Sequence, residues 1–465
     1  MTEQNQNALN ADYDAKMTRK YEGKIKGGNL EIINDQFDGG DPEVTNMRFL
    51  EKFDIQTLTL FISNDLSVKF KSSTLKELTI FNEREYDQDE KQKQRLNMQV
   101  DDLELENLEV MDLHNSVEND QLYNLAKFKK LHSLDVSDNN VDLTHIHMVI
   151  SLTKLTMVSC GLKNIDLISS LVNLKELDIS FNRDFDLSPL YKLKSLTKLS
   201  MNICYLKNIG QIVQLTNLDV LEVSYNQLKN INSIYLLVNL KELNISQNKQ
   251  IDITPLKDLV GLVKLVLGCC NTQHLSALKP LINLQDLDIS CNPNIIITEL
   301  QYLKNLTHLN LEFCNLVSVY VLRPLVNLEE LDISDNKILY LDTHLNEMKN
   351  LKELHVQGNI ISDFTSLEKH PNYNNIDEDG WGCFNISDQK DPSEQQLFKA
   401  NKFRNIERPN IQLKEIQIPH KTLQTTFSNF KQEINAVISN ARQSQIQFTA
   451  NVVRLFQQLN QFGFE

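Results

Sequence analysis

The sequence lacks any long uninterrupted run of apolar residues. A membrane-spanning helix needs roughly 20 consecutive, mostly apolar residues, and no segment of the 465-residue chain approaches that length. The start, MTEQNQNALNADYDAK, also lacks the basic segment followed by an apolar segment that marks a secretory signal. We therefore expect a soluble intracellular protein, located in the cytoplasm or alternatively in the nucleus.

Basic residues are outnumbered. The chain has 47 Lys and Arg against 62 Asp and Glu, which gives a formal net charge of −15. Contact with a phosphate backbone relies on clustered Lys and Arg, so we expect no nucleic-acid partner. The charge is uneven, because residues 397–465 hold nine basic residues against four acidic ones, so this tail carries +5 and the remainder −20. Attraction of the tail to an acidic surface and an ordinary solvated helix face are both compatible with this asymmetry.

Catalytic motifs and a disulfide framework are also missing. The sequence has no G-x-x-x-x-G-K-[ST], no G-x-S-x-G and no H-E-x-x-H. It has seven cysteines, and an odd number without a secretory signal argues against a disulfide framework. We expect a protein that is not an enzyme, with no cofactor and no metal site.

A repeat dominates what is present. The frame L-x-x-L-x-[LIVM]-x-x-[NC] recurs with steps of 21, then 22 eight times, then 23 residues. It starts at Leu131, Leu152, Leu174, Leu196, Leu218, Leu240, Leu262, Leu284, Leu306, Leu328 and Leu351. Leu108 begins a further copy, and weaker copies begin at Ile55 and Leu75. So regular a period predicts a solenoid of stacked units.

Each unit changes its apolar spacing along its length. In LKELDISFNRDFDLSPLYKLKS, which starts at Leu174, apolar residues first alternate and then follow a roughly helical spacing. This predicts one short strand and one helical or 3-10 turn per unit, hence an α/β solenoid. One unit cannot bury its own apolar side chains, each worth about 1.5–3 kcal/mol when buried, so the units must stack. We expect a curved stack with a parallel sheet of twelve to fourteen strands on its concave face.

The ninth position of each unit, counted from its first Leu, is Asn or Cys. An Asn at this turn can bond to unpaired backbone groups of its own and the adjacent unit, and a small buried Cys can replace it. The residues are Asn139, Cys160, Asn182, Cys204, Asn226, Asn248, Cys270, Asn292, Cys314, Asn336 and Asn359. Four of the seven cysteines therefore have a structural role.

The consensus L-x-x-L-x-I-x-x-N-x-L-x-x-I-x-x-L-x-x-L-x-x resembles the leucine-rich repeat family over about residues 53–370. The 22-residue unit is similar to that of the protein phosphatase type 1 regulatory subunit and of the internalins, and leucine-rich repeat proteins of diplomonad protists also look like this chain. The resemblance implies a scaffold or regulator that binds a protein partner through its concave face. A phosphatase regulatory subunit and a secreted or surface adhesin of internalin type are the alternatives.

Candidate partner-binding residues lie where the strands face the concave solvent and where they end. Positions three and five point to that solvent, because side chains alternate along a strand. Large aromatic residues occur at positions eight and ten, and aromatics flanked by charge are typical of anchors in protein interfaces. Polar residues that only keep the face soluble would give the same strand pattern. The candidates are Asp135, Glu176, Asp178, Phe181, Lys198, Tyr205, Glu222, Tyr225, Glu242, Asp286, Asp288, His308, Phe313, Glu330, Asp332 and His355.

Cys269 and Cys291 occupy position eight of adjacent units. This predicts Cα atoms about 5 Å apart, within disulfide reach. A redox or metal pair is one interpretation. We favour two ordinary thiols, because no third or fourth ligand falls at a zinc spacing and intracellular thiols normally stay reduced.

The two ends depart from the period. We expect an N-terminal cap at residues 1–52 with a short helix around 11–24, repeats at 53–370 with a charged insertion at about 83–100, and a C-terminal cap and linker at 371–418. In residues 419–465 apolar residues recur at steps of three and four, which predicts a long amphipathic, coiled-coil-like helix. We expect it to pack against the solenoid or another chain, with self-association through residues 420–465 as the second interpretation.

Overall fold

The structure is a computed structural model of the chain. It describes residues 20, 22, 24–33, 47–62, 70–82, 103–115, 124–139, 144, 146–183, 185–361, 367–371 and 384–385. The chain divides into two compact units, Met1–Asp391 and Pro392–Glu465, and every described residue belongs to the first. The predicted helix at 419–465 and the insertion at about 83–100 therefore lie outside the described residues.

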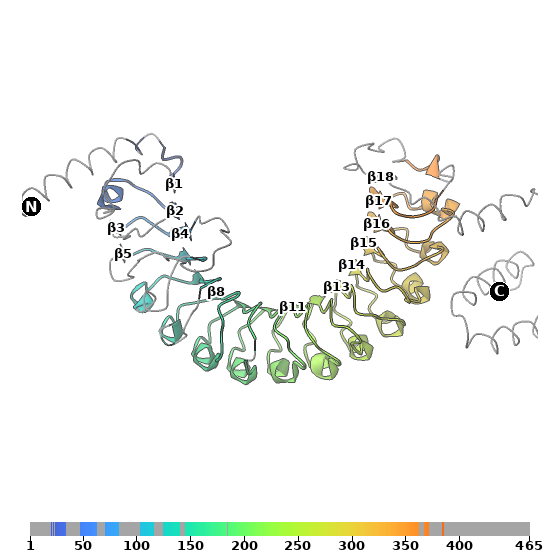
Figure 1. Cartoon of the computed structure of the whole chain (residues 1–465), viewed down its shortest axis with the longest axis horizontal. Coiled ribbons are helices and arrows are strands. Elements are labelled where there is room, and N and C mark those ends of the chain that lie inside the picture. The colour runs from blue at the N-terminus through green and yellow to red at the C-terminus, as the bar shows by residue number, and fades with distance from the viewer. Residues whose placement is uncertain are drawn as a thin grey trace, which may run out of the picture. The chain divides into compact units, whose positions relative to one another are not determined.

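One parallel sheet runs through the first unit (Figure 1). Within the described residues it has 16 strands, and adjacent strands pair in chain order. They are β1 (Asn29–Ile33), β2 (Thr57–Ile62), β4 (Glu77–Asn82), β6 (Val110–Asp112), β7 (Ser133–Asp135), β8 (Lys154–Thr156), β9 (Glu176–Asp178), β10 (Lys198–Ser200), β11 (Val220–Glu222), β12 (Glu242–Asn244), β13 (Lys264–Val266), β14 (Asp286–Asp288), β15 (His308–Asn310), β16 (Glu330–Asp332), β17 (Glu353–His355) and β18 (Phe384–Asn385). From β7 to β17 neighbours pair at equivalent positions of the repeat, as Leu177, Leu199 and Leu221 do.

Short 3-10 helices form the opposite side of the stack. They lie on its outer, convex side and the strands on its inner, concave side (Figure 1). They are η2 (Met47–Lys52), η5 (Leu125–Lys127), η6 (Ile146–Met148), η7 (Asp166–Ser170), η8 (Ser188–Lys192), η9 (Gly210–Gln214), η10 (Asn232–Leu236), η11 (Thr254–Asp258), η12 (Ser276–Leu278), η13 (Thr298–Tyr302), η14 (Tyr320–Leu322) and η15 (Thr343–Glu347). The predicted alternation of one strand and one 3-10 turn per unit is confirmed.

The core lies between the strands and the 3-10 helices. In the unit that starts at Leu196, the residues at positions 1, 4, 6, 11, 14, 17 and 20 are all buried, as the apolar spacing requires. They are Leu196, Leu199, Met201, Leu206, Ile209, Ile212 and Leu215. The seven side chains pack in the space between one unit and the next, so the core is continuous along the stack.

The Asn and Cys residues at position nine satisfy the buried turns. The side-chain amide of Asn226 donates from Nδ2 to three carbonyl oxygens and accepts at Oδ1 from two N–H groups. Its partners are Met201, Val223, Ser224, Cys204 and Leu206, at 2.8–3.1 Å. Cys204 keeps only the donor function, because its Sγ donates to the carbonyls of Ile179 and Asn202 at 3.4 and 3.3 Å. This confirms the role predicted for position nine.

The loop after position nine depends on the next unit. Where the next unit carries Asn, the N–H at position eleven donates to that Asn Oδ1, as from Leu162, Leu206, Leu228, Thr272, Leu316 and Ile338. Where the next unit carries Cys, which offers no such acceptor, the buried apolar residue stands at position twelve instead, as Phe185, Ile251 and Ile295 do. In that second loop the Gln250 N–H donates to the Cys270 carbonyl at 3.0 Å.

A second row of Asn residues, at the end of the units, was not predicted. Each donates from Nδ2 to a backbone carbonyl 23 or 24 residues earlier, in the preceding unit. The row contains Asn173, Asn217, Asn239, Asn283, Asn305, Asn327 and Asn350. These exposed bonds join successive units on the side away from the position-nine turns.

The N-terminal part differs from the expectation in two ways. Strand β1 lies within the predicted cap and pairs in parallel with β2, so the sheet begins before residue 53. A small separate sheet also forms from β3 (Phe70–Ser72) and β5 (Leu103–Leu105). The sheet has two strands more than the twelve to fourteen expected, namely β1 and β18. Neither NLEII, which forms β1, nor Phe384–Asn385, which forms β18, matches the repeat frame, so neither strand could be predicted from it. The short helix expected around 11–24 lies almost wholly outside the described residues.

Among the residues that are described, no helix combines the length and apolarity that crossing a bilayer requires.

Candidate functional site

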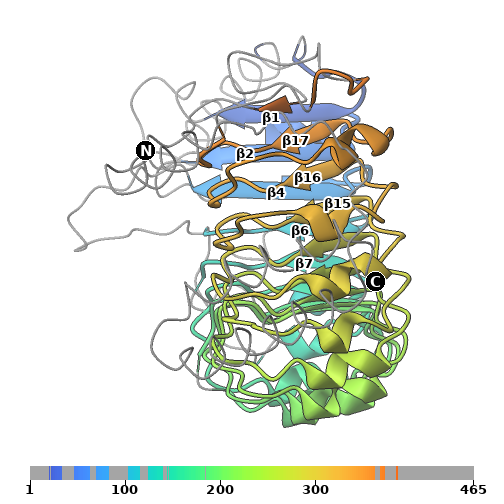
Figure 2. The same cartoon turned by 90° about the vertical axis from the view of Figure 1, so that its right-hand side faces the viewer.

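The concave face is formed by positions three and five of successive strands, which run side by side as β15, β16 and β17 do in Figure 2. In β9 the position-three side chain, Glu176, is exposed, Leu177 is buried, and the position-five side chain, Asp178, is half-buried. The same alternation holds in β8, β12, β13, β15 and β17. The predicted direction of these side chains is therefore confirmed, whereas their role in binding a partner stays a prediction.

Position five also has a structural role that the sequence analysis missed. A carboxylate or amide oxygen here accepts the backbone N–H two residues later, which closes the turn at the end of the strand. The acceptors are Asp112, Asp135, Asp178, Asn244, Asp288, Asn310 and Asp332, at 2.8–3.1 Å. Burial raises the pKa of Asp178, and the nearby carboxylates of Glu222 and Asp135 add to the rise. Four of the predicted partner-binding residues thus also stabilise the fold.

Position three carries alternating charge. Lys154 lies 3.7 Å from Glu176, and Lys264 lies 2.7 Å from Asp286. Lys198 lies 3.7 Å from Glu222, which is at position five of the next unit. Lys154 and Glu176 line a depression over β8, β9 and β10. Its lining residues are Lys154, Leu155, Thr156, Glu176, Leu177, Asp178, Lys198 and Ser200. Exposed ion pairs contribute little to stability, so these charges remain available to a ligand.

Four large aromatic side chains form an aromatic rim at the strand ends. Phe181, Tyr205, Tyr225 and Phe313 are 52, 44, 57 and 48% exposed. The first three follow three consecutive strands, β9, β10 and β11, and Phe313 lies four units further along the chain. The guanidinium of Arg183 lies 4.3 Å from the ring centroid of Tyr205, a cation–π contact that the sequence analysis did not predict.

The left-handed backbone conformation at the rim positions does not favour aromatic residues. Position eight has a left-handed backbone in every unit from Asp138 to Gly358, with φ between +50 and +68°. Tyr205, at position ten, has φ +58°. This conformation costs a residue with a Cβ roughly 1–2 kcal/mol and favours Gly, Asn or Asp. Neither backbone preference nor core packing accounts for bulky, half-exposed aromatic rings at such positions.

The structure brings Cys269 and Cys291 together, as predicted, at the same strand ends. Both are free thiols and only partly buried. Burial and the hydrogen bond to Cys269 raise the pKa of Cys291 to about 12. Burial likewise raises the pKa values of Cys204, Cys270 and Cys314 to about 11. Such thiols stay protonated at neutral pH, which suits hydrogen-bond donors rather than nucleophiles.

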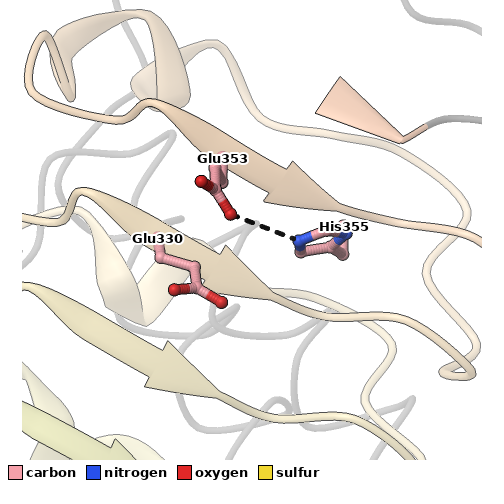
Figure 3. Close-up of side chains that lie close together, drawn as sticks. All are labelled: Glu330, Glu353 and His355. Carbon is pink, nitrogen blue, oxygen red and sulfur yellow. Dashed lines mark ion pairs between the residues drawn. The ribbon is translucent and has the colours of Figure 1, made fainter. Parts of the chain in front are cut away.

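A mixed group of carboxylates and imidazoles lies near the end of the concave face (Figure 3). One oxygen each of Glu330 and Glu353 and one ring nitrogen of His355 lie within 4.8 Å of one another. His308, on β15, lies on the far side of Glu330, with 4.0 Å between Nε2 and Oε2. His308, Glu330 and His355 are among the candidates predicted from the sequence, each for its own strand position, whereas Glu353 is not. The signal that could have grouped them is that His308, Glu330 and Glu353 share position three of adjacent units, with His355 at position five of the last one.

Residues 326–369 match the family model for leucine-rich repeats, two copies. No curated protein is a significant match to the chain. Among solved structures, an internalin (InlF) from Listeria monocytogenes is similar at 22% identity and a TM-score of 0.50, over 70% of this chain and 86% of that one.

Two other solved structures are similar at lower scores. InlJ from Listeria monocytogenes, whose domain includes a cysteine ladder, has 19% identity and a TM-score of 0.45, over 72% of this chain and 64% of that one. TLR13 in a complex with a single-stranded RNA has 18% identity and a TM-score of 0.47, over 69% and 53%.

The likeness to InlF concerns the fold. It is consistent with the repeated strands and 3-10 helices of the stack described here. Together with the matched segment at residues 326–369, these features make the chain similar in fold to leucine-rich repeat proteins.

Proposed function

We propose that the chain is a non-enzymatic scaffold or regulator that binds a protein partner through its concave face and aromatic rim. A curved repeat stack offers an extended surface on rigid strands, which suits recognition of a large ligand. The alternating charges of position three supply electrostatic complementarity, and the rim supplies apolar anchors.

The aromatic rim is the observation that carries this proposal. Aromatic rings are the commonest anchors of protein interfaces, because each buries a large area at a low cost in side-chain entropy. Phe181, Tyr205 and Tyr225 follow three consecutive strands beside the charged depression over β8–β10. A partner that lies across these units would contact rings and charges together.

The proposal is tested by capture from an extract of the native cell. We expect the double variant Phe181→Ala/Tyr225→Ala to lose the proteins that the unaltered chain captures, as identified by mass spectrometry. Both rings are exposed, so their removal should leave the urea unfolding midpoint nearly unchanged.

The convex side offers a matched control. Tyr191 and Tyr235 are each 49% exposed and lie in η8 and η10. Tyr191→Ala/Tyr235→Ala should capture the same proteins as the unaltered chain. Equal capture by both double variants, or loss in the convex variant alone, would show that the rim is not the binding surface.

We also propose a cytoplasmic location and an amphipathic helix at 419–465. The acidic charge and the odd cysteine count support the first, and the apolar steps of three and four support the second.

A further inference from the structure

The alternation of charge along position three changes character between β15 and β17. Glu330 and Glu353 stand directly opposite each other on adjacent strands. Like charges in that arrangement destabilise a sheet unless a cation compensates them. Further toward the N-terminus, lysines such as Lys154 and Lys264 supply the compensating charge. Here the basic groups are His308 and His355, and a neutral imidazole, unlike an ammonium group, carries a lone pair that binds metal ions.

Each imidazole lies beside one of the two facing carboxylates. His355 Nε2 lies 4.0 Å from Glu353 Oε2, and His308 Nε2 lies 4.0 Å from Glu330 Oε2. Donor atoms that bind one tetrahedral zinc ion at about 2.0–2.2 Å lie roughly 3.3 Å apart. In Figure 3 the carboxylates of Glu330 and Glu353 and the ring of His355 gather over β16 and β17. These three donor atoms already lie within 4.8 Å of one another, so side-chain rotations can bring them to ligand spacing. His308, on the neighbouring strand, would join them from its place 4.0 Å from Glu330.

The hydrogen bonds of Thr307 determine which nitrogen of His308 is available. The Thr307 hydroxyl has one proton, which it donates to the Gln285 carbonyl at 3.0 Å. The hydroxyl lies 2.9 Å from His308 Nδ1 and must therefore accept a hydrogen from it. In the neutral ring the lone pair is then on Nε2, the atom that faces Glu330. Histidine ligands of metals are commonly oriented by such a bond to the other ring nitrogen.

We infer that His308, Glu330, Glu353 and His355 form a binding site for a divalent transition-metal ion of the zinc class. Two imidazoles and two carboxylates match zinc, nickel or cobalt, whereas calcium and magnesium prefer oxygen ligands alone. The ion would neutralise the facing carboxylates and connect three adjacent strands. The four residues are not part of the aromatic rim, so the metal site and the proposed function can be tested separately.

Zinc chloride titrated into the chelator-treated full chain, followed by calorimetry, tests the inference. We expect one equivalent to bind, and His308→Asn/His355→Asn to weaken its binding at least about tenfold. Glu353→Gln, which preserves the shape of the side chain, should also weaken it. The variants' urea unfolding midpoints without zinc establish that they fold.

The control is His114→Asn/His132→Asn. These exposed histidines also lie beside carboxylates, 3.1 Å from Asp138 and 4.0 Å from Glu109. Zinc binding should survive this change. The inference is overturned if the unaltered chain does not bind zinc, or if His308→Asn/His355→Asn binds it as tightly. The absorption spectrum of the cobalt-loaded chain distinguishes this site from the thiols. A sulfur-to-cobalt charge-transfer band would place the ion at Cys269 and Cys291 instead.

Discussion

A single side-chain amide can hold two units of this stack together. Asn226 makes five hydrogen bonds, three as donor and two as acceptor, and is buried. Cys204, at the same position of the preceding unit, makes only donor contacts through its sulfur. The two residues are therefore not equivalent, because the amide also supplies an acceptor to the loop before it.

Asn226→Leu should lower the free energy of unfolding by about 1–3 kcal/mol, because buried backbone groups lose their partners. Cys204→Ser should cost less, since a hydroxyl can donate to the same carbonyl oxygens. Urea unfolding midpoints of the two variants and the unaltered chain measure the difference. Asn292→Leu serves as a replicate in another unit and should behave like Asn226→Leu. Equal, near-zero shifts for all three variants would contradict the role assigned to position nine.

Residue types alone predicted the turn but not every side-chain role. The spacing of Asn226 and Cys204 follows directly from the repeat, so both could be assigned from the sequence. The turn-closing bond of Asp178 could not, because an acidic residue on an exposed strand position looks the same whether it binds a partner or a backbone N–H. The grouping of Glu330, Glu353 and His355 requires the strand register and side-chain directions, which become definite only in three dimensions.

At the scale of the element, the loop of each unit depends on whether the next unit carries Asn or Cys at position nine. Leu206 donates from position eleven to an Asn oxygen of the next unit, whereas the loop with Phe185 at position twelve precedes a Cys unit. The strand and 3-10 turn of every unit were predictable from apolar spacing. The two loop forms were not, since they differ by one residue in a region of otherwise similar composition.

Two deletions of 22 residues each test this dependence. Removing 218–239 places the Cys204 unit before the Asn248 unit, which still offers an amide oxygen. Removing 196–217 places the Asn182 unit, whose loop suits a Cys neighbour, before the Asn226 unit. Both lose one unit and one interface, but only the second leaves a buried amide oxygen without its donor.

We expect the 196–217 deletion to be less stable than the 218–239 deletion by about 1–3 kcal/mol in urea unfolding. The equal length of the two deletions makes each the control for the other. If the 218–239 deletion were the less stable one, the loop form would not depend on the following unit.

At the scale of the whole molecule, stability comes from contacts between neighbouring units. Deleting residues 420–465 should therefore leave the repeats folded, because the buried residues of the stack pack between successive units. A cooperative urea transition close to that of the full chain is the expected result. Loss of cooperative unfolding would mean that the tail belongs to the core and that the predicted domain boundary is misplaced.

Light scattering on the same truncated chain distinguishes the two roles predicted for the tail. A lower mass than that of the full chain would indicate self-association through residues 420–465. An unchanged monomeric mass with increased binding of an apolar dye would indicate that the tail covers a surface of its own chain.

The dependence of each turn on the next unit gives the stack a direction. Leu228 and Ile338 find their acceptors 20 and 21 residues later in the chain. A ribosome makes the N-terminal units first. A unit that has just emerged therefore holds an incomplete turn until the following unit arrives with its Asn oxygen or, before a Cys unit, with a backbone carbonyl such as that of Cys270. The newest unit of a growing chain is always the least complete one, so a stalled or truncated product carries its defect at its C-terminal end.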